Sequence, residues 1–386
     1  MAQDGVRFGI LGPVEMCVTG DVVPLGTPKQ RAALATLVIH RNRIVGIDEL
    51  ISAVWGTDAP KGARHTLHTY VSNVRRLAAR PGIDVHAVLA AVPPGYRLSV
   101  PDNDCDLGRF IVNRTNGVNA AAAGRFEEAS GLFTAALSEW RGPVLGDLRD
   151  FTFFDAFVTA LDEDKLMTQL AHAKSEIACG RPLSVIRVLE SLAAEHPYRE
   201  PLWAQLIAAY YLGDHQSEAL AAYHRLRTAL AEDLGIDPGS AVRSLYARIL
   251  RQEPLDVLGA AQSHADETMK TFRDHVAPHA DHADGPVLLG ADGSCHPVLA
   301  MTTRIGRSPA NDIVLGDPKV SRYHAAVIDT GSSFVIADLQ SANGVYLQGR
   351  RIHAGATLAN GDVVRIGDHR FAFEVAARGH GDDVTE

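Results

Sequence analysis

The spacing of the apolar residues changes twice along the chain, so one type of fold cannot accommodate the whole sequence. In the middle region apolar side chains recur at helical spacing, as at Leu202, Leu206 and Tyr210, which is typical of amphipathic helices. The region before it mixes strand-like runs with helices, and the region after it has short alternating runs broken by turn residues, which is typical of a β-sandwich. The 386 residues suffice for roughly two to three domains, and we expect a multidomain α+β protein.

We place the boundaries of the three regions at 1–104, 105–255 and 286–386, with a linker at 256–285. The linker loses the helical period, although short helical pieces within it remain compatible with its composition. Its histidines His275, His279 and His282 would need a helix and a fixed fourth ligand to hold a metal ion. The sequence supplies no such ligand at a defined spacing, so we expect no metal site.

The composition is that of a folded protein, with 46% hydrophobic and 22% charged residues. No apolar run approaches the ~20 residues of a membrane-spanning helix, and the first residues lack the pattern of a secretory signal. The four cysteines lie far apart, without a CxxC pair: Cys17, Cys105, Cys179 and Cys295. This usage favours reduced thiols over a disulfide framework or zinc site, so we expect a cytoplasmic protein that does not bind a membrane.

The first region carries a positive charge although the whole chain has a net charge of −9. Residues 1–100 contain eleven Lys and Arg against seven Asp and Glu, and such local charge matters more for nucleic-acid binding than the total. Three helices are predicted, at Lys29–His40, Ile47–Trp55 and Ala63–Ala79. Strands are predicted before and after them, at Arg7–Leu11, Glu15–Val18, Val88–Val92 and Tyr96–Val100.

The third helix has one apolar face, formed by residues such as Leu67, Val71 and Val74, and one polar face. The polar face bears Arg64, His68, Thr69, Ser72, Asn73, Arg75 and Arg76. Such side chains can bond to base edges and phosphates in a major groove, while Arg97 in the following hairpin can enter the minor groove. An ordinary amphipathic helix with a solvated polar face is the alternative that periodicity alone leaves open.

The segments GTPKQRAALATLVI, IDELISAVWG, ARHTLHTYVSNVRRL and PPGYRL follow one another in this region. Together they resemble the winged helix-turn-helix domain of OmpR-type regulators, and in particular the Streptomyces antibiotic regulatory protein (SARP) family. The resemblance implies binding to double-stranded promoter DNA. It does not fix the individual base contacts, because the polar residues of this helix differ with the site that is read.

The middle region contains two similar stretches, AAAAGRFEEASGLFTAAL and AYYLGDHQSEALAAYHRL, each of which looks like a tetratricopeptide (TPR) helix pair. The longer segment from HPYREPLWAQ to LYARIL resembles the bacterial transcriptional activation domain of the SARP family. By that resemblance the all-α region contacts RNA polymerase or a second protomer in a homodimer. A scaffold that merely separates the terminal domains is the alternative.

Three polar blocks occur in order in the last region: Gly306-Arg307, then Ser321-Arg322-Tyr323-His324, then Asp338 to Gly344 with Ser341 and Asn343. They resemble the forkhead-associated (FHA) domain, a β-sandwich that displays these residues on loops at one end. Arg307 and Ser321 can bind the dianionic phosphate of a phosphothreonine, and the amide of Asn343 can bracket the adjacent peptide backbone. A supporting role in the loops is expected for Gly306, Arg322, His324, Ser341 and Gly344.

The combination of the three regions resembles FHA-bearing regulators of the SARP family, and this implies a phosphorylated Ser/Thr protein kinase as partner. Neither a P-loop, nor HExxH, nor GxSxG occurs, so we expect neither an enzyme nor a bound cofactor. The alternative function is a signalling adaptor in which the winged helix is only a structural module. Specific, salt-sensitive DNA binding distinguishes the regulator from the adaptor.

Overall fold

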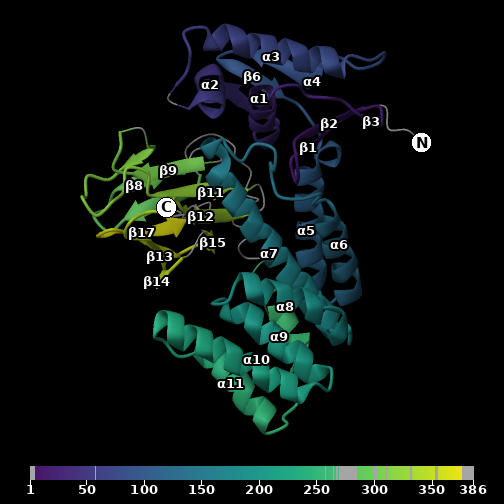
Figure 1. Cartoon of the computed structure of the whole chain (residues 1–386), viewed down its shortest axis with the longest axis vertical. Helices are drawn as coiled ribbons and strands as arrows, with labels where there is room; N and C mark the ends of the chain where they lie inside the picture. Colours follow the sequence, from purple (N-terminus) through teal and green to yellow (C-terminus); the bar gives the residue numbers. More distant parts are fainter. Residues whose placement is uncertain are drawn as a thin grey trace, which may run out of the picture. The chain divides into compact units, whose positions relative to one another are not determined.

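The structure is a computed structural model of the chain. It describes residues 5–56, 58–256, 258–263, 265–266, 268, 285–298, 302–309, 311–330, 333–352 and 355–375. Contacts divide the chain into two compact units, the first formed by residues 1–112, 138–165 and 271–386 and the second by residues 113–137 and 166–270. The elements and their labels are shown in Figure 1. The units do not coincide with the three predicted regions, because the helical region contributes to both of them.

The first region forms a winged helix-turn-helix. Its elements are β1 (Val6–Gly9), β2 (Glu15–Val18), β3 (Asp21–Val22), α1 (Pro28–Ile39), β4 (Ile44–Gly46), α2 (Ile47–Trp55), α3 (Ala63–Ala78), α4 (Val85–Val88), β5 (Leu89–Val92) and β6 (Gly95–Leu98). They build two three-stranded sheets, with the orders β1-β2-β3 and β4-β6-β5. The three expected helices are confirmed to within a residue at each end. The short elements β3, β4 and α4 were not predicted, because two to four residues carry no measurable periodicity.

Local sequence explains where the helices begin and how they dock. The hydroxyl of Thr27 caps α1 by accepting a hydrogen bond from the Gln30 N–H (3.3 Å), and Pro28 occupies the first turn. On α3 the apolar side chains Leu67 and Val71 are almost fully buried. The helix therefore docks through one face, as its periodicity predicted.

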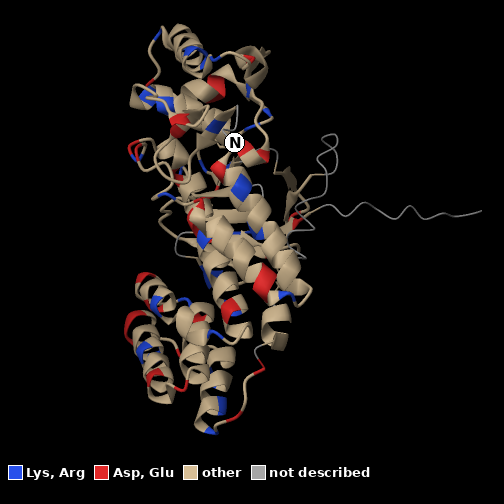
Figure 2. Cartoon of the chain, turned by 90° about the vertical axis from the view of Figure 1, so that its right-hand side faces the viewer, with Lys and Arg blue, Asp and Glu red and all other residues tan. Residues whose placement is uncertain are grey.

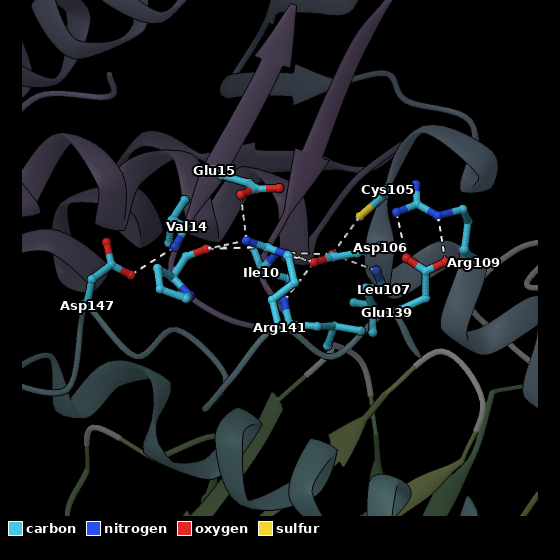
Figure 3. A network of polar contacts seen from close by, with 12 residues as sticks. Ile10, Val14, Glu15, Cys105, Asp106, Leu107, Arg109, Glu139, Arg141 and Asp147 are labelled. Carbon is cyan, nitrogen blue, oxygen red and sulfur yellow. Dashed lines mark hydrogen bonds and ion pairs between the residues drawn. The ribbon is translucent and has the colours of Figure 1, made fainter. Parts of the chain in front are cut away.

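A buried carboxylate anchors the N-terminal sheet to the start of the helical region (Figure 3). Asp106 is 2% exposed and accepts hydrogen bonds from the backbone N–H groups of Ile10 (2.9 and 3.0 Å), Leu11 (2.9 Å) and Leu107 (2.7 Å). The guanidinium of Arg141 also binds this carboxylate (3.1 Å). These bonds satisfy backbone donors that would otherwise be buried without partners, so the turn after β1 depends on residues beyond the predicted boundary at 104.

The middle region is helical, as expected. Its helices are α5 (Asp106–Ala122), α6 (Phe126–Ser138), α7 (Asp155–Ala178), α8 (Ile186–Glu195), α9 (Glu200–Leu212), α10 (Gln216–Ala229) and α11 (Ser240–Leu250). The single turn η1 (Asp102–Asp104) precedes α5. Between later helices lie η2 (Thr152–Phe154), η3 (Pro182–Ser184) and the π-helical η4 (Leu230–Leu234). The two predicted TPR-like stretches correspond to α5–α6 and α9–α10. Within the predicted linker, residues 258–263 are helical.

Aromatic and leucine side chains form the core of the second unit, as the sequence predicted. Trp203, Tyr210, Tyr223 and Leu226 are each less than 10% exposed and belong to one apolar cluster, while Tyr211 packs at its edge. Trp203 also donates from its indole N–H to the carbonyl of Pro197 (2.9 Å). The polar atom of this large side chain is thus satisfied while its rings are buried.

The last region is a β-sandwich. Its strands are β7 (Val287–Gly290), β8 (Cys295–Pro297), β9 (Thr302–Gly306), β10 (Ile313–Val314), β11 (Ala325–Asp329), β12 (Phe334–Asp338), β13 (Val345–Leu347), β14 (Arg350–Arg351), β15 (Gly355–Leu358), β16 (Val363–Ile366) and β17 (His369–Glu374). They form a five-stranded sheet, β10-β9-β11-β12-β15, and a six-stranded sheet, β14-β13-β16-β17-β7-β8. Val327, Ile336 and Phe373 lie in the apolar core of the sandwich. The fold class expected from the sequence is confirmed in all three regions.

Candidate functional site

Three loops at one end of the five-stranded sheet bring together the residues predicted to bind phosphothreonine. Arg307 follows β9, the segment from Ser321 to His324 precedes β11, and Asn343 lies in the loop after β12. Hydrogen bonds join the loops: Arg307 N–H donates to the carbonyl of Ser321 (2.9 Å), and Ala342 N–H donates to the Ser321 hydroxyl (3.1 Å). The site is therefore assembled from segments up to 36 positions apart.

The side chain of Arg307 is exposed, and its Nε atom donates to the carbonyl of Val320 (3.3 Å). No carboxylate pairs with this guanidinium among the residues that the structure describes. The Ser321 hydroxyl lies in the adjacent loop, to which the Arg307 backbone is bonded. The guanidinium of Arg307 is thus held at one nitrogen and is not neutralised by any acid that the structure describes. It can therefore form charge-assisted hydrogen bonds with an anion beside Ser321.

His324 is completely buried and bridges two of the loops. Its Nδ1 accepts the N–H of Ser321 (3.0 Å), so the proton of the neutral ring resides on Nε2, which donates to the carbonyl of Gly344 (3.3 Å). Burial lowers the pKa of His324 and keeps the imidazole neutral. His324 thus joins the loop of Ser321 to the loop of Gly344, as expected for a residue that supports the binding loops.

The loop after β12 is held by its own side chains. Ser341 N–H donates to Asp338 (2.9 Å), and the Ser341 hydroxyl accepts the N–H of Gly344 (3.0 Å). Gly344 has a φ of 74°, which favours glycine. The amide of the exposed Asn343 donates to the carbonyl of Lys319 (2.6 Å), which ties this loop to the one carrying Ser321.

Sequence reasoning missed the role of Asn311, the first residue of the segment NDIVL at positions 311–315. Its side chain is 7% exposed and donates to the carbonyls of Ser308 (2.8 Å) and Arg322 (2.7 Å). A Cβ atom on Gly306 would lie only 2.4 Å from the Arg322 carbonyl oxygen, so this glycine is needed for the close approach of the two loops. Arg322 itself is exposed, and its backbone rather than its side chain makes these contacts. The only sequence signal for Asn311 was its place two positions before the short apolar run from Ile313 to Leu315.

The polar face of α3 is divided between exposed and internally engaged side chains. Arg64, His68, Thr69, Ser72 and Arg76 are exposed, as is Arg97 on β6. The positions of Lys and Arg on the chain are marked in Figure 2. The hydroxyls of Thr69 and Ser72 donate to backbone carbonyls one turn earlier, at 3.2 and 2.9 Å. Such bonds are local and can be exchanged for contacts to a ligand.

Two other residues expected to read DNA make hydrogen bonds within the winged helix. Arg75 donates from Nε and Nη2 to the carbonyl of Leu89 (2.9 and 2.7 Å) at the start of β5. Asn73 donates to Gln30 on α1 (3.0 Å) and accepts from Arg76 (3.1 Å).

Two further predicted DNA contacts also have partners within the winged helix. His68 is hydrogen-bonded through Nδ1 to the hydroxyl of Tyr96. Arg64 lies 3.7 Å from Asp48, but both side chains are largely exposed. The base and phosphate contacts of all these residues stay predictions.

Two expectations concern sites elsewhere in the chain. None of the helices in the described part of the chain combines the length and hydropathy that a membrane span requires. Within the same residues, no three His, Cys, Asp or Glu side chains come together as a metal site would need. His275, His279 and His282 lie outside the described residues.

Known protein families match all three regions. The model of the C-terminal domain of transcriptional regulatory proteins matches residues 21–98, that of the bacterial transcriptional activator domain matches 105–250, and that of the FHA domain matches 303–367. Each match falls inside the region for which the corresponding resemblance was inferred. Together they confirm the domain types and their order.

The chain is also similar to whole regulatory proteins. It is 56% identical to the transcriptional regulatory protein EmbR of Mycobacterium tuberculosis over 374 residues, which cover 97% of this chain and 96% of that protein. The regulatory protein DnrI of Streptomyces peucetius is 31% identical over 254 residues, covering 64% of this chain and 93% of DnrI. The solved structure of M. tuberculosis EmbR in complex with a low affinity phosphopeptide has a TM-score of 0.91 and 55% identity, covering 97% of this chain and 99% of that chain.

Proposed function

Because the chain belongs to the EmbR-like transcriptional regulators of the SARP family, we propose that its FHA domain binds phosphothreonine peptides of a Ser/Thr protein kinase and so links kinase signalling to transcription. The observation that carries the proposal is the loop cluster around Arg307, Ser321 and Asn343, in which an exposed guanidinium is not neutralised by any described acid. A phosphothreonine dianion offers the charge and acceptor oxygens that these groups lack.

The solved complex of M. tuberculosis EmbR supports the phosphopeptide as the type of ligand. The identity of the phosphoprotein as a kinase rests on the resemblance to FHA-bearing SARP regulators. The winged helix supports promoter DNA as the second ligand through the exposed residues of α3 and Arg97. The protein would act as a binding regulator in the cytoplasm rather than as an enzyme.

We extend the proposal to the helical region, which would contact RNA polymerase or a second copy of the chain. Stacked helix pairs present surfaces to protein partners, and Leu183 and Val188 are exposed apolar residues of this region, at 57% and 45%. Cross-linking of the promoter complex with and without polymerase tests the first partner. Sedimentation of the free protein tests the second.

The central experiment measures binding of a fluorescent phosphothreonine peptide from a kinase activation loop to the full chain. Arg307→Ala should weaken binding by about 100-fold, since a charge-assisted pair with a dianion is removed, whereas the exposed control Arg350→Ala should bind as the unmodified protein does. The unphosphorylated peptide should not bind. Equal affinity of Arg307→Ala and Arg350→Ala would contradict the proposal.

The kinase is tested separately, by capture of an autophosphorylated Ser/Thr kinase on the immobilised full chain. Treatment of the kinase with a phosphatase should abolish capture. If peptides bind but no phosphorylated kinase is captured, phosphothreonine binding stands and the kinase as partner is wrong.

A further inference from the structure

The outer face of the five-stranded FHA sheet is buried, although a sandwich needs only its inner faces covered. Val327 and Ile336 point into the sandwich core. Their neighbours Ile328 and Val335, which pair across β11 and β12, point to the opposite face, and both are fully buried. Ala326 and Ala337, the next pair on this face, are 0% and 1% exposed. We call these four residues the docked face.

Residues of η2 and α7 lie against the docked face. In the register of the sheet, Arg304 on β9 pairs with Ala326, and Gly355 on β15 pairs with Ala337, so both belong to the same face. The guanidinium of Arg304 lies 5.0 Å from the centre of the Phe153 ring. A Cβ atom on Gly355 would lie 3.2 Å from Cγ2 of Thr159. The absence of a side chain at this position thus permits the close approach of α7.

The turn between β11 and β12 makes polar contacts with the same helix and with the winged helix. The hydroxyl of Ser333 donates to Asp164 (2.7 Å), and both residues are 0% exposed. Asp329 lies 3.9 Å from the guanidinium of Arg43, which directly precedes β4. In this pair the carboxylate of Asp329 is buried and the side chain of Arg43 is half exposed. The buried hydrogen bond between Ser333 and Asp164 fixes the turn against α7.

The strands of the docked face lead directly into the phosphopeptide loops. Arg304 is three residues before Arg307, and Ala326 is two residues after His324. Ala337 is four residues before Ser341. If one of these loops moves, the docked face is only two to four positions away along the chain. The movement must therefore be accommodated within those positions or displace strands of a sheet that is packed on both faces. Close-packed interiors transmit such displacements rather than absorb them.

We propose that the docked face, packed on η2 and α7, couples the phosphopeptide site energetically to the winged helix through the turn between β11 and β12, where Asp329 pairs with Arg43. This inference rests on the proposed function, because it requires that the loops bind a phosphopeptide. Binding of a phosphopeptide to the loops would shift the packing of the docked face on Phe153 and Thr159. This shift would change the affinity of the winged helix for DNA. By thermodynamic linkage, DNA must change the affinity for the peptide by the same factor.

The test titrates the full chain with two probes. One is a phosphothreonine peptide selected on the full chain from a peptide library, and the other is a duplex selected on it from random DNA. In the unmodified protein a saturating peptide should change the dissociation constant for DNA by about fivefold or more. The reciprocal titration should give the same factor.

Two variants address the docked face without touching the loops. Phe153→Ala removes the ring that contacts Arg304, and Gly355→Val places a side chain against Thr159. Both should reduce the linkage to less than twofold while each probe still binds. Phe153→Tyr retains the ring and should retain the linkage, and so should Arg350→Ala. Thermal unfolding identifies a variant that fails to fold, in which case the other variant decides.

The outcomes separate the inference from the proposed function. If the peptide binds and Arg307→Ala abolishes its binding, but DNA affinity does not change, the proposed function stands and the coupling is refuted. Full linkage in both Phe153→Ala and Gly355→Val also overturns the coupling. If the unmodified protein binds no phosphopeptide, the proposed function fails and the inference falls with it.

Discussion

The phosphopeptide loops and the polar face of α3 are built from the same kinds of side chains, yet they are supported in different ways. In the loops, buried groups such as His324 and Asn311 hold the backbone, and Arg307 is left exposed beside them. On α3, Arg75 and Asn73 themselves serve as supports. The type of a polar residue therefore does not show whether it is available to a ligand. Its hydrogen-bond partners within the protein decide this.

The two surfaces also differ in where their supports lie in the sequence. The bracing residues of the loops belong to the FHA domain. The winged helix depends in part on Asp106 and Arg141, which belong to the region after it (Figure 3). Changes at these supports should therefore affect mainly the surface that each of them holds.

The largest effect is expected for Asp106→Ala. The change leaves the backbone N–H groups of Ile10 and Leu11 buried without an acceptor, which should lower the free energy of unfolding by about 4 kcal/mol. Thermal unfolding of the full chain measures this, with the exposed Asp150→Ala as control. Below the unfolding transition the variant should bind the phosphothreonine peptide within about threefold of the unmodified protein, and a larger loss would contradict the separate support of the two surfaces.

His324→Ala should lower the stability less than Asp106→Ala does, and it should affect the FHA loops rather than the winged helix. The N–H of Ser321 and the carbonyl of Gly344 lose their partner, at a cost of about 2 kcal/mol in stability. Peptide affinity should fall at least tenfold because the loops are no longer held together, while DNA affinity in the absence of peptide should be unchanged. The exposed His86→Ala is the control. Unchanged peptide affinity in His324→Ala would show that the histidine only fills space.

The domain types could be predicted from the sequence, because each depends on patterns that a single segment contains. Thr27 and Pro28 marked the start of α1, and the spacing of Arg307, Ser321 and Asn343 marked the FHA loops. The supports could not be predicted in this way. Asp106 bonds to Ile10 across 96 positions, and nothing in its local sequence distinguishes it from a solvated carboxylate at a helix start.

The same limit applies to α3. Its polar face was recognised from periodicity, but periodicity cannot distinguish Arg75 from Arg76, which are adjacent and of the same type. Only the position of the Leu89 carbonyl, 14 residues later, decides that Arg75 donates to the protein itself. For this reason the sequence alone could not show which residues of α3 contact DNA.

This pair provides a sharper comparison within one helix. Arg75→Ala should lower the stability of the protein by about 1 kcal/mol, because two hydrogen bonds to Leu89 are lost. Arg76→Ala should leave the stability unchanged and weaken DNA binding, with a less steep dependence on salt if the guanidinium binds a phosphate. Thermal unfolding and fluorescence anisotropy measure the two quantities. Loss of DNA affinity in Arg75→Ala without loss of stability would reverse the assignment.

The smallest expected effect is a pH dependence confined to the loops. Because the pKa of His324 is lowered by burial, its neutral form contributes stability that is present above the unfolded pKa of about 6.5 and is lost as the pH falls through the lower folded value. Unfolding of the free protein should therefore become easier below about pH 6.5, and His324→Gln should remove this part of the dependence. The free protein must be used, because a phosphothreonine also takes up a proton near pH 6. An identical pH profile for His324→Gln would mean that the lost stability arises from other groups.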